Sequence, residues 1–330
     1  MRMMTPLMSY EDYLSLFSYP TYSSDELNNE EGFSFPVVLN CIICLLGVSG
    51  NGLVMWVVIH EVRKTVSMIW IINLSVADFT FTFLLPFTVV QQALALHWPF
   101  GSFLCKFLSF SSQLNMFASV FTLTVIALDR CISVTFPIWS QNHRTVKMAL
   151  GVSLMVWILA AVFSSPCFLI REIMEDGVEG KTICFYSVKE YILRNLMLSR
   201  FILAFLMPFS IITICYCIIL VKVRQRWRKS SGRSQRVTCL IIWAFFICWL
   251  PFHVLYLIHT MTNLHFTTSL PLATCLAYTS SCINPLLYMY VGRGSCIQIK
   301  KRIQITLKLL HEEMSINSSR SEWRLSRAGE

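Results

Sequence analysis

Charged side chains are rare in the apolar parts of this chain, and three of them stand out. Asp78 is the only charged residue between positions 65 and 96, while Asp129 and Arg130 lie side by side where the uncharged run 107–128 ends. An ionised side chain is costly to bury unless another group pairs with it. These three residues are therefore the first candidates for a functional role.

Other polar residues recur at helical spacing inside uncharged runs. Asn115 and Ser119 are four residues apart, as are Ser280 and Asn284, and residues at that spacing share one face of a helix. Helices packed around Asp78 would bring these oxygen atoms together. Such surroundings suit a small hard cation such as sodium, or a water cluster. The alternative is a neutral Asp78 whose hydrogen bonds only tie helices together.

The composition predicts a membrane protein. Hydrophobic residues make up 55% of the 330 residues and charged residues only 14%, against about a quarter in soluble domains. A helix that spans a bilayer needs about 20 mostly apolar residues. Seven such segments are expected, from runs that are uncharged or hold only Asp78, at 32–59, 65–96, 107–128, 148–170, 201–221 and the two halves of 237–292. The predicted fold is an all-α, seven-transmembrane helix bundle.

The distribution of basic residues predicts the orientation of the helix bundle in the membrane. Most of the 27 Lys and Arg residues lie in loops and a tail that are cytoplasmic if the N-terminus is outside. The net charge of +9 is thus mainly a signal of topology, and nucleic-acid binding is its poorer explanation. Residues 1–31 contain no apolar segment of a signal peptide, so the first helix is expected to act as the insertion signal.

Two of the 13 cysteines differ from the rest in their expected position. Most lie inside the predicted helices, where a thiol packs as a small hydrophobic group. Cys105 and Cys184 fall on the outer, oxidising side. We predict a disulfide between them that holds the long loop after the fourth helix over the mouth of the bundle.

Short motifs occur in order, one set in each expected helix. They read GN at 50–51, LSVAD at 74–78, DRC at 129–131, Trp157, Pro208 with Tyr216, CWLP at 248–251 and NPLLY at 284–288. With this set, residues 35–305 resemble the rhodopsin-like (class A) G-protein-coupled receptors. The resemblance implies an activation switch of Asp129, Arg130, Tyr216, Trp249, Pro251, Asn284, Pro285 and Tyr288. In that family the arginine pairs with its acid at rest and, once released, helps to form the G-protein pocket.

Longer stretches are similar to the chemoattractant branch of that family, above all to chemerin receptors and next to formyl-peptide receptors. They include HWPFGSFLCK, NMFASVFTLTVIALDRCISV, PIWSQNHRTV and SCINPLLY. Cys131, where most relatives of the wider family have Tyr, is shared with this branch. The resemblance implies a receptor for a peptide or small-protein chemoattractant, chemerin-like, that signals through inhibitory G proteins in leukocyte chemotaxis and inflammation.

At several positions the residue differs from that of related receptors, and these differences reduce the number of ligand classes to be expected. Ser112 stands where amine receptors have an aspartate, and Gln113 where formyl-peptide receptors have one. Amine and formylated-peptide ligands are therefore disfavoured. The seventh helix contains no lysine, which excludes a retinal Schiff base. The sequence GRGSC follows that helix, and its two glycines weaken the start of helix 8.

The ligand is expected to meet arginines in the upper bundle. Arg200 lies about two turns before Pro208, and Arg171 matches an arginine of the chemerin-receptor pattern. A guanidinium donates two hydrogen bonds to a carboxylate, so Arg200, with Arg171, is predicted to receive the C-terminal carboxylate or a backbone carbonyl of a peptide. Arg171 is alternatively an anchor at the membrane interface. The other predicted ligand-binding residues are Gln113, Trp98, Phe185, Tyr256 and Tyr278.

Both tails carry candidate modification sites. Tyr10 and Tyr13 flank two acids, a context for sulfation and for capture of a basic ligand; alternatively this tail only solvates. Cys296 is a candidate for palmitoylation. Phosphorylation of serines in the C-terminal tail would add negative charge that recruits arrestin. The candidate sites are Ser315, Ser318, Ser319, Ser321 and Ser326.

The predicted organisation is an extracellular acidic tail over 1–34, the bundle over 35–292, helix 8 over 293–305 and a cytoplasmic regulatory tail over 306–330. We expect a multi-pass plasma-membrane receptor without an enzyme site, a cofactor or a metal other than sodium. Its expected partners are the peptide, an inhibitory heterotrimeric G protein, arrestin, receptor kinases and membrane lipids. A formyl-peptide or lipid-mediator receptor, and a decoy that binds chemoattractant without signalling, stay open as alternatives.

Overall fold

The computed structural model describes residues 31–61, 65–94, 97–175, 180–226, 232–262 and 269–291. Residues 1–286 form one compact unit, and all contacts given below lie within it. The predicted helix 8, residues 1–30, the C-terminal tail and the candidate modification sites lie outside the described residues, as does the side chain of Tyr288, whereas residues 31–34 of the predicted extracellular tail are helical.

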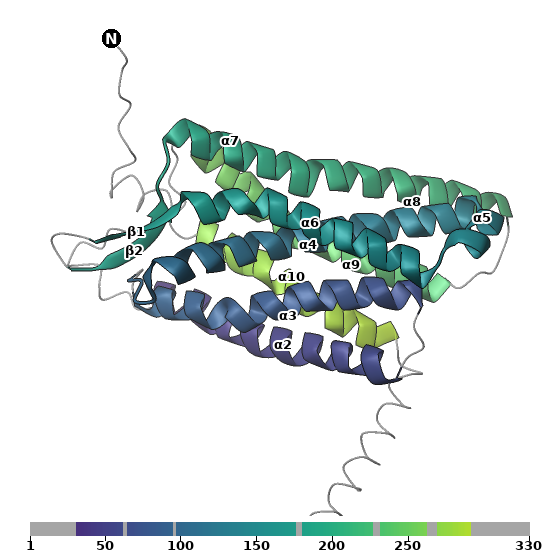
Figure 1. The fold of residues 1–330 in the computed structure, drawn as a ribbon, viewed down its shortest axis with the longest axis horizontal. Helices are drawn as coiled ribbons and strands as arrows, with labels where there is room; N and C mark the ends of the chain where they lie inside the picture. Colours follow the sequence, from purple (N-terminus) through teal and green to yellow (C-terminus); the bar gives the residue numbers. More distant parts are fainter. Residues whose placement is uncertain are drawn as a thin grey trace, which may run out of the picture. The chain divides into compact units, whose positions relative to one another are not determined.

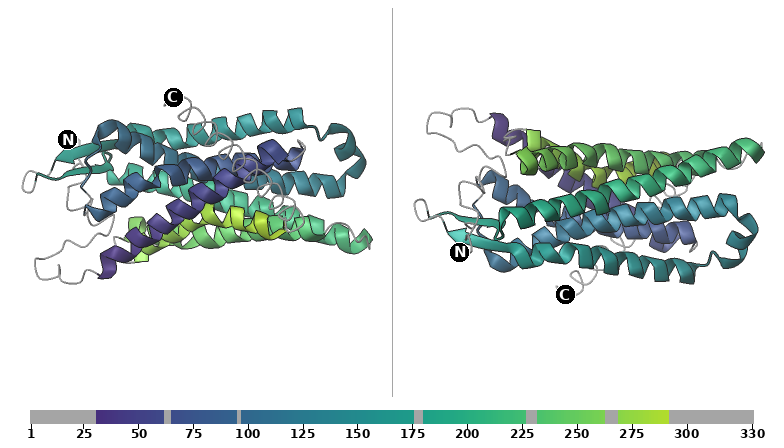
Figure 2. Two further views of the ribbon diagram at one scale, coloured as in Figure 1. Left: turned by 90° about the horizontal axis from the view of Figure 1, so that it is seen from below. Right: turned by 90° about the horizontal axis from the view of Figure 1, so that it is seen from above.

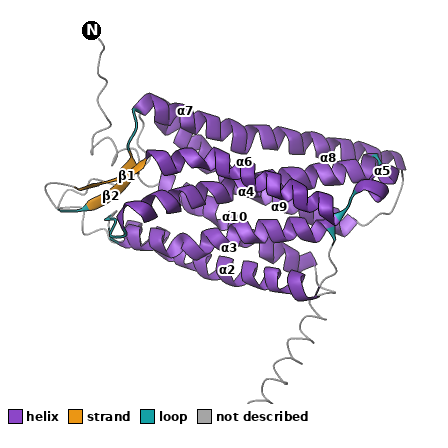
Figure 3. Cartoon of the chain, viewed as in Figure 1, coloured by secondary structure: helices purple, strands orange, loops and turns teal. Residues whose placement is uncertain are grey.

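The described chain is helical apart from one hairpin (Figure 3). Its long helices are α2 (Glu31–Glu61), α3 (Val66–Ala93), α4 (Gly101–Thr135), α6 (Val146–Ile170), α9 (Gly232–Thr262), α10 (Ser269–Val291) and a continuous helix of α7 (Glu190–Phe201), η1 (Ile202–Leu206) and α8 (Met207–Arg226). The short α5 (Pro137–His143) follows α4. Figures 1 and 2 show the long helices running alongside one another. Among the described residues six helices are long and apolar enough to cross a membrane, and α10 is the further, seventh helix of the predicted bundle.

The side chains are sorted as a bilayer requires. Large apolar side chains point outward, as Leu45 and Leu154 do with exposed fractions of 71% and 63%. Polar side chains such as Asn51, Ser75 and Thr82 are completely buried. Lipid can solvate the apolar side chains but offers no hydrogen bond to the polar ones. The polar side chains therefore lie in the interior, where they can contact other helices.

A close approach of α2 and α3 depends on Gly47. A Cβ atom at this position would lie 2.3 Å from the Cγ2 atom of Thr82 on α3, so a larger residue cannot fit without displacing the helix. Asn51, one turn further along α2, donates from Nδ2 to the backbone oxygen of Ser281 on α10 at 2.9 Å. The small residue and the amide together fix α2 against both neighbours.

The helix that carries Arg200 contains a π turn. Residues Ile202–Leu206 form η1, in which the backbone N–H of Met207 bonds the oxygen of Ile202, and Pro208 follows at once. A π turn adds one residue to the helical register, which rotates the preceding segment relative to the rest by about 100°. Pro208 is therefore preceded by a turn that changes which face of α7 looks inward.

The loop after α6 forms an antiparallel hairpin of β1 (Arg171–Glu175) and β2 (Thr182–Tyr186), in which Arg171 pairs with Tyr186. The loop before α4 joins it, because the backbone N–H of Trp98 donates to the oxygen of Thr182 at 2.6 Å and the N–H of Thr182 donates to Nδ1 of His97 at 3.1 Å. The hairpin is thereby held at the outer end of α4 (Figure 1).

Gly47→Ala is expected to lower the free energy of unfolding by about 1–3 kcal/mol, because the added methyl group overpacks the contact with Thr82. The measurement is the thermal unfolding midpoint of the purified protein in detergent. Gly151→Ala on α6 is the matched control, since its Cβ would meet no atom within 4 Å and alanine is the better helix former. Equal behaviour of the two variants would contradict the packing explanation.

Candidate functional site

Asp78 lies at the centre of the bundle and is 2% exposed. Its Oδ2 atom accepts a hydrogen bond of 2.7 Å from Nδ2 of Asn284 on α10. Ser75, one turn earlier on α3, is completely buried, and its hydroxyl has no hydrogen-bond partner among the described residues. A carboxylate and an orphaned hydroxyl on one helix face leave oxygen atoms available for a further group.

The other predicted network residues are buried too, but the hydrogen bonds of their side chains go to groups other than Asp78. The Oγ atom of Ser119 donates to Oδ1 of Asn115 at 3.4 Å. Trp249 on α9 donates from Nε1 to Oγ of Ser280 at 3.1 Å. The predicted polar network therefore consists, in this structure, of three linked pairs contributed by α3, α4, α9 and α10.

At the cytoplasmic end of α4, Asp129 pairs with a residue that the sequence did not indicate. Nε and Nη2 of Arg144 donate to the two carboxylate oxygens of Asp129 at 2.7 and 2.9 Å. Arg130 donates from Nη2 to Oγ of Ser67 at 3.2 Å. The expectation that Asp129 holds Arg130 at rest is thus wrong for this structure, because the guanidinium of Arg144 occupies both oxygens.

Two other polar atoms near this end of the bundle lack partners. Nε of Arg130 and the hydroxyl of Tyr216 are both buried, and neither makes a hydrogen bond to a described residue. Both residues were predicted to act in the activation switch. A buried polar group without a partner is unfavourable by about 1–3 kcal/mol, so a rearrangement that satisfies both atoms would be favoured.

A cavity of about 220 Å³ opens between the hairpin and the outer ends of the helices. Two arginines, Arg171 and Arg200, reach its wall, and the remaining lining residues are neutral. Among the polar ones are Ser109, Ser112, Gln91, Gln92 and Gln113; among the aromatic ones are Trp98, Phe252, Tyr256 and Tyr278. The cavity is therefore positively charged, with one polar wall and one aromatic wall.

Arg200 is buried in this wall, where its hydrogen-bond partners are two sulfur atoms and the side chain of Tyr186. It is 6% exposed, and its guanidinium donates to Sδ of Met197 at 3.5 Å and to Sγ of Cys167 at 3.2 Å. Sulfur is a weak acceptor. Among the described residues no carboxylate pairs with Arg200. A buried guanidinium in this condition is a ready binding point for an anionic oxygen.

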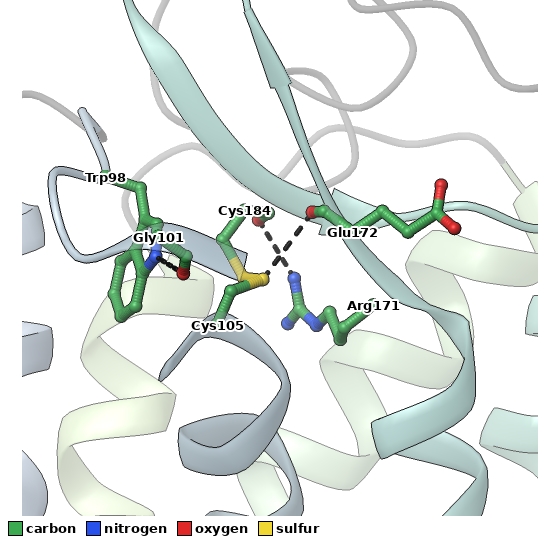
Figure 4. Close-up of a disulfide and its surroundings, with 6 residues drawn as sticks. All are labelled: Trp98, Gly101, Cys105, Arg171, Glu172 and Cys184. Carbon is green, nitrogen blue, oxygen red and sulfur yellow. Dashed lines mark hydrogen bonds between the residues drawn. A yellow bond between two sulfur atoms is a disulfide. The ribbon is translucent and has the colours of Figure 1, made fainter. Parts of the chain in front are cut away.

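The hairpin forms the roof of the cavity, and Arg171 belongs to it. Arg171 donates from Nη1 to the backbone oxygen of Cys184 at 3.0 Å, and its guanidinium lies 3.7 Å from the centre of the Tyr186 ring. Cys184 is bonded to Cys105 of α4, and Figure 4 shows Arg171 beside this disulfide. The predicted disulfide is confirmed, and it holds the roof on the bundle.

A profile described as "7 transmembrane receptor (rhodopsin family)" matches residues 50–288. The chain belongs to this family. It is 37% identical over 320 residues to chemerin-like receptor 1 of Sus scrofa, with 87% of each chain covered. The corresponding human receptor is 39% identical over 282 residues, which cover 78% of this chain and 75% of that receptor. N-formyl peptide receptor 2 of Pongo pygmaeus is 37% identical over 304 residues, 84% of this chain and 87% of that receptor.

Membership of this family settles several expectations. The protein is a multi-pass receptor of the plasma membrane and a G-protein-coupled receptor, and this class of protein is not enzymatic. The disulfide and the seven-helix fold also agree with the resemblance.

The receptor places six of the seven predicted ligand-binding residues in the wall of one cavity, and Phe185 is the exception. Side chains alternate along a strand, so Cys184 and Tyr186 face the cavity while Phe185, between them, does not line it. Sequence reasoning missed Tyr186, although this alternation, counted from the disulfide, would have found it. Pro251 and Pro285 lie inside α9 and α10 as predicted.

Loss of the disulfide is expected to loosen the roof of the cavity. Cys105→Ser, Cys184→Ser and the double variant should each destabilise the receptor by about 2–4 kcal/mol, with no additional loss in the double variant. The readout is the thermal unfolding midpoint. Cys41→Ser, at an exposed free cysteine, is the control and should leave the midpoint unchanged. A double variant clearly weaker than either single one would show that the two thiols act separately.

Proposed function

We propose that this receptor binds a peptide or small-protein chemoattractant, chemerin-like, and signals through inhibitory heterotrimeric G proteins. The observation that carries the proposal is Arg200, a buried cation on the cavity wall that pairs with no carboxylate among the described residues. The relatives named chemerin-like receptor 1 and N-formyl peptide receptor 2 support a peptide or protein ligand of the chemoattractant kind.

The charge of the cavity favours an anionic end of the ligand. Arg171 and Arg200 both line it, and no acidic side chain of the described residues does. A carboxylate that enters would replace weak sulfur acceptors by charge-assisted hydrogen bonds, which are about twice as strong as neutral ones. We therefore assign the ligand's carboxylate to Arg200, with Arg171 beside it in the roof.

Gln113 favours a peptide over a carboxylic acid of lipid type. Its Oε1 atom is buried and has no hydrogen-bond partner among the described residues, and Gln113 lines the cavity. An amide oxygen needs a donor, which the backbone N–H of a peptide supplies and an alkyl chain does not. The aromatic wall of Phe252, Tyr256 and Tyr278 can then pack apolar side chains of the peptide.

Signalling is favoured over the decoy alternative by the cytoplasmic end. Among the described residues, the guanidinium of Arg130 donates one side-chain hydrogen bond, to Ser67, and the buried hydroxyl of Tyr216 has no hydrogen-bond partner. This arrangement is suited to change when a G protein approaches. Arrestin and receptor kinases are proposed as further partners through the C-terminal serines, together with membrane lipids around the basic inner loops.

We also propose a sodium ion beside Asp78. The fit rests on the carboxylate of Asp78 and the orphaned hydroxyl of buried Ser75, one turn earlier on the same helix. Hard oxygen donors of this kind are those that a small cation prefers. When bound, sodium would supply a positive charge that balances the carboxylate of Asp78.

Arg200→Gln is expected to weaken the response to chemerin about 100-fold, because a buried carboxylate loses its charged partner. The assay is inhibition of cAMP in cells matched for surface expression. Arg194→Gln on the same helix is the control, since Arg194 is exposed, and it should respond like the unmodified receptor. Chemerin whose C-terminal carboxylate is amidated should lose potency on the unmodified receptor but not on Arg200→Gln.

The outcomes separate the alternatives. Unchanged potency of Arg200→Gln would overturn its assignment as the carboxylate site. Uptake of chemerin without any cAMP response would favour the decoy receptor, and a response to carboxylic lipids but not to chemerin would favour a lipid-mediator receptor.

Asp78→Asn should abolish sodium binding, because the amide lacks the charge that attracts the cation. The measurement is the thermal unfolding midpoint in sodium chloride against choline chloride. We expect the midpoint of the unmodified receptor to rise with sodium and that of Asp78→Asn to be indifferent. A sodium effect that survives in Asp78→Asn would place the ion elsewhere.

A further inference from the structure

We propose that Arg144, through Asp129, sets how easily Arg130 is released for activation. Arg144 follows the short helix α5, and Asp129 and Arg130 lie near the end of α4. In this proposal Arg144 is a positioning residue that keeps the acid away from Arg130. The part that concerns signalling rests on the G-protein function proposed above, whereas the Asp129–Arg144 pair does not.

The pair itself is well formed. Arg144 approaches Asp129 with two parallel hydrogen bonds of 2.7 and 2.9 Å, and the carboxylate side chain is only 8% exposed. Bidentate geometry and partial burial distinguish it from an isolated surface ion pair, which contributes little. One carboxylate with both oxygens engaged has little capacity left for a second guanidinium.

Arg130 is correspondingly weakly held. Its Nη2 atom donates to Oγ of Ser67 at 3.2 Å, and its Nε atom is buried without a partner among the described residues. Nη2 of Arg144 donates to the same Ser67 hydroxyl, also at 3.2 Å. Ser67, at the start of α3, therefore ties two guanidinium groups to one point, while the two oxygens of Asp129 accept hydrogen bonds from Arg144.

The position of Arg144 depends on α5. Its backbone N–H donates to the oxygen of Ser140 at 3.0 Å, and the hydroxyl of Ser140 lies 3.1 Å from that of Ser133 on α4. Arg144 is thus positioned by a seven-residue helix packed on the end of α4. Any partner that displaces α5 would draw Arg144 from Asp129 and return the acid to Arg130.

The direction of the effect follows from competition for one carboxylate. Without the guanidinium of Arg144, the nearest strong cation for Asp129 is Arg130, the next residue of α4. That new pair would restrain Arg130 in the resting state. Neutralising Arg144 should therefore reduce signalling.

The experiment is a double-mutant cycle of Arg144→Gln and Asp129→Asn with two readouts. The first is basal nucleotide exchange without ligand, in membranes supplied with heterotrimeric G proteins of each subfamily and matched for receptor density. We expect Arg144→Gln to lower it about five- to tenfold, and to have no further effect in the Asp129→Asn background. Arg144→Lys should restore part of it, because the positive charge is kept.

The second readout is the thermal unfolding midpoint, which does not depend on any G protein. Each single variant should lower the midpoint by about 2 °C or more. The midpoint of the double variant should be no lower than that of the less stable single variant. Lys147→Gln removes the same charge from an exposed position nearby and is the control for both readouts, with no expected change.

Each other result counts against the proposal. Raised basal exchange in Arg144→Gln would show that the pair restrains the receptor instead of freeing Arg130. An equal drop in the Asp129→Asn background would mean that Arg144 contacts the G protein directly. Additive midpoint shifts would contradict the pair. A receptor silent with every G protein would contradict the signalling function, and the thermal cycle would then decide on the pair alone.

Discussion

A bilayer offers no hydrogen bonds, so each polar group inside this bundle must find its partner in the protein. The amide of Asn51 reaches the backbone of Ser281, Asn284 reaches Asp78, and the indole of Trp157 donates to Asn73 at 2.8 Å. Each of these bonds joins two helices that are distant in the sequence. The relative positions of the helices follow from this requirement together with close packing at Gly47.

The same constraint makes the exceptions informative. Buried polar atoms without partners would not persist in an apolar medium unless another state or another molecule satisfied them. Among the described residues, four of them occur at Gln113 beside the cavity, at Ser75 beside Asp78, and at Arg130 and Tyr216 near the cytoplasmic end, while Asn40, Asn51 and Trp70 hold others within the bundle. The first four mark the places to which the ligand, the sodium ion and the activating rearrangement are assigned in the proposals above.

Helix α4 carries residues of all three places, because it extends from the cavity at its outer end to Arg130 near its cytoplasmic end. Gln113 lines the cavity, Asn115 and Ser119 are buried in its middle, and Arg130 lies near its inner end. The disulfide fixes its outer end to the hairpin, while Arg144 and Ser67 hold groups at its inner end. The interactions at the two ends differ in strength, because the outer end is held by a covalent disulfide and the inner end by hydrogen bonds that can exchange.

The sequence by itself determined the seven helices, their orientation and the disulfide, since the length of apolar runs and the placement of Lys and Arg depend only on the solvent. It also brought Asp78 and Asn284 together, because polar residues in different spans must meet inside. The tertiary structure alone decided that Asp129 binds Arg144, that Tyr186 and not Phe185 faces the cavity, and that a π turn precedes Pro208. These contacts depend on the direction in which each side chain points from its helix or strand. A shift of one residue moves a side chain to another face, and the pattern of apolar residues does not specify that shift.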